Sequence, residues 1–118
     1  MTFKQIKESF RREWASVHSC YLFERDKFVR LHNSLEDDET SVFRSDLEES
    51  MNEAALNCNR AYNGMSELVN TIRVFSRVAS KESECAELYS LFQYYDDIVW
   101  NEFDNVSSIR SLAHLDFY

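Results

Sequence analysis

Apolar side chains between Leu88 and Phe103 recur at steps of three and four residues, the spacing typical of a helix. A first stripe contains Leu88, Phe92, Tyr95, Val99 and Phe103, and a second group widens it: Leu91, Tyr94, Ile98 and Trp100. A one-sided surface helix needs an apolar stripe only about 100° wide. We therefore expect this helix to face two neighbours, or one neighbour and a second chain.

The first part of the chain predicts one long helix over about residues 3–34. Apolar residues keep a single helical phase from Phe3 to Leu35, interrupted only around Glu24. Thr2 and Gln5 have the spacing of a capping box, in which the two side chains bind free backbone amides at the start of a helix.

A second helical stripe runs from Phe43 to Ala79. It follows the acidic segment 33–40, which predicts a solvated turn, and Thr40 or Ser41 is the expected cap. The phase of the stripe is unchanged across Gly64, so we favour one helix over two helices joined there. A glycine inside a helix costs up to about 1 kcal/mol relative to alanine, so Gly64→Ala is expected to stabilise the fold.

Together these patterns predict an all-α fold over residues 1–118, a single antiparallel bundle of three long helices. A break at Gly64 would make it four. The chain has no proline and one glycine, which disfavours hairpins and sandwiches. Short connections force neighbouring helices to run antiparallel. The length and layout, with Trp14 in the first helix, resemble a spectrin-type repeat, as an architectural analogy.

The formal net charge of −8 argues against a nucleic-acid partner, because lysine and arginine supply most phosphate affinity. Charge also alternates along the chain: residues 1–35 and 60–82 are net basic, and 36–59 and 83–118 are net acidic. One interpretation is that these blocks lie beside one another in the bundle. The other is that the face formed by Lys4, Lys7 and Arg11 meets an acidic partner.

No residue pattern indicates a cofactor or a metal. Cys20, Cys58 and Cys85 lack a C-x-x-C spacing, and none of the three histidines belongs to a Glu-x-x-His pair, the unit of di-iron bundles. We therefore expect the three cysteines to be buried free thiols in a reducing compartment. The chain also lacks a signal-peptide pattern and an apolar run of about 18 residues, so we expect a cytoplasmic protein without membrane association.

The segment from Arg25 to His32, RDKFVRLH, resembles the signature of HEPN-domain ribonucleases. In that all-helical family an arginine, a polar residue and a following histidine promote RNA cleavage without a metal. The resemblance would make Arg25 and His32 catalytic. It covers eight residues, and it lies on the first helix, whereas the family signature lies on a late helix and is completed across a dimer.

We favour a noncatalytic protein-binding module, namely an adaptor, a complex subunit or an inhibitor, over the HEPN-like ribonuclease or an inactive relative of it. The expected partner is a second copy of the chain or a larger protein. Candidate contact residues are the aromatic and apolar side chains that widen the stripe of residues 88–103, with one neighbouring acid: Tyr94, Tyr95, Asp97, Ile98 and Trp100. Asp97, Glu102 and Asp104 are expected to form an acidic rim around them.

Overall fold

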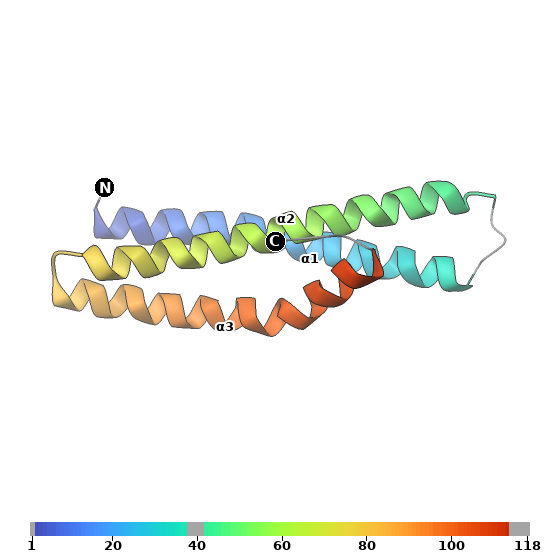
Figure 1. The fold of residues 1–118 in the computed structure, drawn as a ribbon. Coiled ribbons are helices and arrows are strands. Elements are labelled where there is room, and N and C mark those ends of the chain that lie inside the picture. The colour runs from blue at the N-terminus through green and yellow to red at the C-terminus, as the bar shows by residue number, and fades with distance from the viewer. Residues whose placement is uncertain (1, 38–41, 114–118) are drawn as a thin grey trace.

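The computed structural model describes residues 2–37 and 42–113, and it confirms the all-α bundle. Three long helices run up, down and up: α1 (Phe3–Asp37), α2 (Arg44–Val78) and α3 (Glu82–Leu112) (Figure 1). The described residues contain no strand. The molecule is a rod with extents of 63 × 21 × 19 Å, consistent with helices of 31 to 35 residues.

The start of α1 is the predicted capping box. The Gln5 backbone amide donates to the Thr2 hydroxyl at 3.2 Å, and the Thr2 amide donates to the Gln5 side-chain oxygen at 2.8 Å. The helix continues to Asp37, three residues beyond the expected end. Leu35, the last position of the predicted apolar stripe, is buried, so the helix continues past residue 34 to place it in the core.

The helix α2 is continuous through Gly64, as expected. It begins at Arg44, and its N-cap is Phe43, which makes no side-chain capping bond. Thr40 and Ser41, the expected caps, lie outside the described residues. The Arg44 guanidinium donates to the Leu35 carbonyl at 3.1 Å, which ties the start of α2 to the end of α1.

The core is built from large side chains on α1 and small ones on α2. Every buried α1 position carries a bulky residue, at steps of four or seven: Phe10, Trp14, Tyr21, Phe28 and Leu35. The facing part of α2 is rich in small buried residues: Ala54, Ala55, Cys58 and Ala61. Small residues let helix backbones approach closely, so α2 packs tightly on both neighbours. The helices α1 and α3 meet mainly through long side chains.

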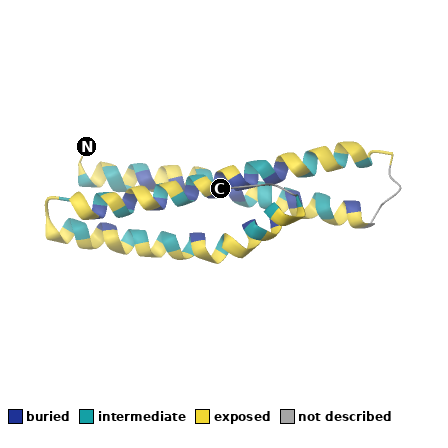
Figure 2. Ribbon diagram, in the orientation of Figure 1, coloured by how far each residue is buried: buried dark blue, intermediate teal, exposed yellow. Residues whose placement is uncertain are grey.

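The helix α3 is much less buried than its apolar content predicts. Only Leu88, Val99, Val106 and Ile109 are buried on it, whereas ten α2 residues are (Figure 2). The last third of α3 bends toward α1 and α2 (Figure 1). The expectation that α3 is covered on two sides is therefore only partly met, and apolar surface remains exposed on it.

The three cysteines are free thiols. Cys58 is fully buried, and burial raises the pKa of its thiol to about 12, which keeps it protonated and unreactive at neutral pH. Cys20 is exposed and Cys85 is only half-buried, contrary to the expectation that all three are buried.

Gly64 lies where α2 crosses α1 closely, which changes the stability expectation. A Cβ atom at this position would lie 3.2 Å from Val17 Cγ1 on α1. Valine is stiff about χ1 and cannot easily turn away. We now expect Gly64→Ala alone to be near neutral, because this contact offsets the gain in helix propensity of about 1 kcal/mol.

In a Val17→Ala background the obstructing methyl group is absent, so Gly64→Ala should stabilise by about 1 kcal/mol. A double-mutant cycle measured by urea denaturation tests this coupling. Equal effects of Gly64→Ala in both backgrounds would show that the crossing does not limit this site.

Candidate partner-binding site

Large aromatic side chains remain exposed along α3. Trp100 is 65% exposed and Tyr94 is 64% exposed, and Tyr89 and Phe103 are also exposed. Trp100 and Phe103 contact each other, with ring centroids 5.9 Å apart. Since aromatic side chains are enriched at protein interfaces, their exposure on one helix marks α3 as the candidate site.

The structure places the predicted contact residues on different sides of α3. Tyr95 turns toward α1, where its ring centroid lies 4.9 Å from that of Phe10 and 4.8 Å from that of Trp14. Ile98 is half-buried against the core. Tyr94 and Asp97 are exposed, and Trp100 stands on the side of α3 that faces α2.

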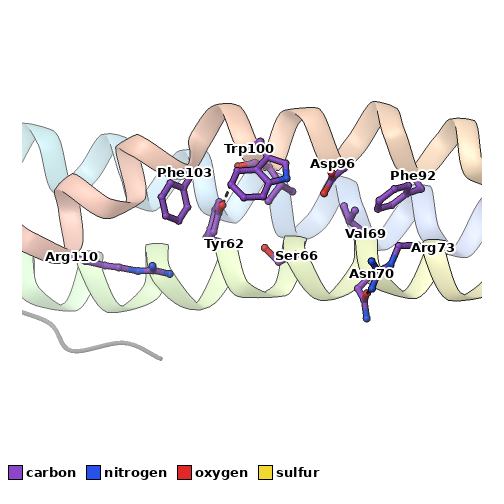
Figure 3. Close-up of a pocket in the computed structure, with 11 residues that line it drawn as sticks. Tyr62, Ser66, Val69, Asn70, Arg73, Phe92, Asp96, Trp100, Phe103 and Arg110 are labelled. Carbon is purple, nitrogen blue, oxygen red and sulfur yellow. Dashed lines mark hydrogen bonds between the residues drawn. The ribbon is translucent and has the colours of Figure 1, made fainter.

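A groove runs between α2 and α3, and Figure 3 shows it from the side opposite α1. We call it the α2–α3 groove. Its volume is about 510 Å³, and it is lined by side chains of both helices: Tyr62, Ser66, Val69, Asn70, Arg73, Phe92, Asp96, Val99, Trp100, Phe103 and Arg110. A second hollow of about 520 Å³ shares Arg73 and Phe92 with it and continues toward Tyr89.

Hydrogen bonds join α2 to α3 at the Tyr62 end of the α2–α3 groove. The Tyr62 hydroxyl donates to the Val99 carbonyl at 3.0 Å, which holds α2 against α3 (Figure 3). Arg110 Nε donates to Asn59 Oδ1 at 2.6 Å, and its guanidinium lies 5.9 Å from the Tyr62 ring centroid. Further along, Arg73 Nη2 donates to Asn70 Oδ1 at 2.7 Å, while Arg73 Nε is buried without a hydrogen-bond partner.

Sequence reasoning missed most of this groove. Tyr89, Phe92, Asp96, Trp100 and Phe103 are spaced by three or four residues, so they share one side of α3. This spacing could have identified the α3 side of the groove from the sequence alone. The α2 side, above all Arg73, could not be found this way, because its register against α3 depends on packing.

The predicted basic face is partly used within the molecule. Lys7 Nζ on α1 binds Glu87 Oε1 on α3 at 2.6 Å and lies 4.6 Å from the Phe3 ring centroid. Lys4 is exposed, with a long 3.9 Å approach to Glu8, and Arg11 is exposed. The contact of Lys7 with Glu87 agrees with the interpretation that basic and acidic blocks lie beside one another.

Glu102 is the centre of a polar cluster between α1 and α3. Its carboxylate accepts hydrogen bonds from the Tyr21 hydroxyl at 2.6 Å, from Arg25 Nη1 at 3.1 and 3.2 Å, and from Asn105 Nδ2 at 3.0 Å. Burial acts to raise the pKa of Glu102, but these bonds outweigh it, so the pKa is lowered. Glu102 is thus engaged within the molecule by Tyr21 and Arg25 of α1, and its place in an acidic rim for a partner stays a prediction.

Arg25 and His32 border one hollow of about 340 Å³ between α1 and the end of α3. The Arg25 guanidinium, however, binds Glu102 and also Asp26 Oδ1 at 3.3 Å. Burial acts to lower the pKa of Arg25, but the hydrogen bonds and charge of Glu102 outweigh burial, so the pKa is raised. His32 stacks on Phe28, with Nε2 3.6 Å from Glu36 Oε1. Arg25 is therefore engaged by two carboxylates that would compete with an RNA phosphate.

We predict that the purified protein does not cleave RNA in the presence of a metal chelator. Incubation of labelled single-stranded RNA with the wild-type chain and with His32→Ala measures this. Cleavage by the wild type that is lost in His32→Ala would contradict the prediction and establish the ribonuclease alternative.

Comparisons with models of protein families, with curated protein sequences and with solved structures give no match for this chain. Over residues 2–37 and 42–113, no helix has both the length and the apolar composition needed to cross a membrane. In the same part of the chain, no three histidine, cysteine or acidic side chains are grouped so that they could hold a metal ion.

Proposed function

We propose that this chain is a noncatalytic protein-binding module, an adaptor, a complex subunit or an inhibitor, that binds its partner through α3. The observation that carries the proposal is the exposure of Trp100 beside Phe103, at the rim of the α2–α3 groove. Monomeric proteins rarely leave clustered large apolar side chains in water, and tryptophan and tyrosine are the most frequent binding hot spots.

Two sides of α3 are available for contact. The first is the α2–α3 groove, with Trp100 at its edge. The second is the side of Tyr94, whose ring stands edge-on to Tyr95 at 5.0 Å, with Asp97 exposed nearby. Ile98 extends the second side toward α1. The groove side is the stronger candidate because it is hollow and presents both apolar and polar groups.

The partner is a second copy of this chain or a different protein. The three free thiols support a reducing, cytoplasmic location. The net charge of −8 supports a protein partner over a nucleic acid.

Trp100→Ala is expected to weaken partner binding by at least about thirtyfold, the loss typical of a hot-spot residue. Its effect on the free energy of unfolding should stay within about 0.5 kcal/mol, as for other exposed positions. Affinity capture from the native host, followed by titration of the captured protein, measures the first effect.

The matched control is Phe23→Ala. Phe23 is an aromatic residue of similar exposure, 61%, but it lies on α1 outside the α2–α3 groove. Phe23→Ala should leave capture unchanged. Equal capture by Trp100→Ala and the wild type would show that this part of α3 does not carry the interaction.

A further inference from the structure

The α2–α3 groove has two chemically different walls. The α3 wall is mainly apolar, with Phe92, Val99, Trp100 and Phe103 beside Asp96 and Arg110, and the α2 wall is mainly polar, with Ser66, Asn70 and Arg73 beside Tyr62 and Val69 (Figure 3). A ligand that fits both walls must itself carry an apolar side and a polar side. An amphipathic helix has this property, since its two faces are separated along its whole length.

The dimensions of the groove also suit a helix. The two hollows share Arg73 and Phe92 and extend along α3 from Phe103 to Tyr89. At 1.5 Å per residue this stretch is roughly 21 Å long, enough for about four turns of a helix lying beside α2 and α3. Such a helix would be the fourth of a bundle that now leaves this side open.

The charge of the groove differs from that of the whole chain. The two hollows together are lined by Arg73, Arg77 and Arg110 and by the acids Asp96 and Glu82, so this surface is less acidic than a chain with a net charge of −8. An acidic partner therefore meets less repulsion here than over the chain as a whole.

Arg73 gives the acidic group a specific position. Its Nη2 atom is used by Asn70, but its Nε–H is buried and has no acceptor. A buried donor without an acceptor is unfavourable, and a hydrogen bond to a carboxylate is stronger than one to a neutral acceptor. An aspartate or glutamate at the edge of a docked helix would satisfy this donor after the Arg73 side chain turns outward, since Nε–H is covered in the unbound chain.

We propose that the α2–α3 groove binds an amphipathic helix of a different protein, with its apolar face on the α3 wall and an acidic side chain at Arg73. This inference rests on the proposed function, because it names the class of partner for the same surface. A second copy of this chain is the less favoured occupant, since its three described helices already pack against one another and leave no separate helix to enter the groove.

The test uses a displayed library of helix-forming peptides of about 18 residues, with apolar and flanking positions randomised. Peptides selected on the wild-type chain should carry Asp or Glu beside an apolar stripe. Their affinity should fall about tenfold or more in Arg73→Gln and in Trp100→Ala, and remain unchanged in Phe23→Ala. Arg73→Glu should shift selection toward peptides with lysine at the flanking position. Thermal unfolding of each variant checks that the bundle is intact.

A second readout locates the peptide without relying on loss of affinity. The chain has two tryptophans, of which Trp14 is buried, so Trp14→Phe leaves Trp100 as the sole tryptophan, whose fluorescence is excited selectively over that of tyrosine. The selected peptide should protect Trp100 from acrylamide quenching. If Trp14→Phe does not fold, the same protection is measured as the change in total quenching of the wild type.

Selection of peptides without acidic residues, or affinity that is unchanged in Arg73→Gln, would overturn the proposal. Failure to select any peptide would overturn it too. Some peptides could lose binding in the double variant Tyr94→Ala with Ile98→Ala but keep it in Trp100→Ala. That result would overturn the proposal that the α2–α3 groove is the binding site, and it would agree with the proposed function of binding through α3. Sedimentation equilibrium that shows a dimer dissociated by Trp100→Ala would identify a second copy as the occupant instead.

Discussion

Replacing Tyr21 with alanine is expected to lower the free energy of unfolding by about 4 kcal/mol, the largest single effect we predict. Tyr21 is 0% exposed in the middle of α1, and its ring centroid lies 6.0 Å from that of Tyr62 on α2. Its hydroxyl donates to Glu102 on α3 at 2.6 Å. One side chain therefore joins all three helices, and alanine would leave a cavity and remove a hydrogen bond to a charged group.

Tyr21→Phe separates these two contributions. Phenylalanine keeps the packing and removes only the hydroxyl, so the expected loss is about 1.5–3 kcal/mol, the range for a hydrogen bond to a charged group. Urea denaturation of the wild type and both variants measures the difference. A loss below about 1 kcal/mol for Tyr21→Ala would contradict the central place of Tyr21 in the bundle.

The second large effect concerns Glu102 and depends on pH. At neutral pH, Glu102→Ala is expected to cost about 2–3 kcal/mol, because Tyr21 and Arg25 lose their charged acceptor. The pKa of Glu102 in the folded protein lies below its ordinary value of 4.5. The unfolded chain therefore binds the proton more tightly than the folded one, and the stabilisation by the charged carboxylate is complete only above about pH 4.5.

As the pH falls below 4.5 and through the lowered pKa of the folded state, this stabilisation is lost. Unfolding curves of the wild type and Glu102→Gln between pH 7 and pH 3 should thus converge on acidification. Glu8→Gln is the matched control, since Glu8 is exposed and its ion pair with Lys4 is long, at 3.9 Å, and therefore weak. A difference between wild type and Glu102→Gln that stays constant down to pH 3 would contradict the lowered pKa.

The fold was predictable because helical periodicity is a local property. The stripes of α1 and α2, the capping box at Thr2 and the continuity through Gly64 each follow from the order of residues along one helix. The tight contact of Gly64 with Val17 does not, since it depends on where α1 crosses α2. The end of α1 was displaced by three residues, because buried Leu35 lies beyond the expected end.

The site was predictable to a smaller extent. Periodicity correctly indicated more apolar surface on α3 than two neighbours cover, and Tyr94 and Trp100 are exposed. It could not say which charged residues another helix engages: Glu102 and Lys7 were expected to face a partner, and both bind within the molecule. Arg73 was missed because its unmatched Nε–H is recognisable only from the packing around it.

The most direct measurement of the central claim is photo-crosslinking in the native host with p-benzoylphenylalanine placed at single positions. At Tyr89, an exposed aromatic residue of α3 that lines the second hollow and leaves Trp100 in place, we expect a covalent adduct with one partner protein. At Phe23, which is exposed on α1, we expect none. Adducts that form equally from both positions, or only from Phe23, would contradict the account that this protein binds its partner through α3.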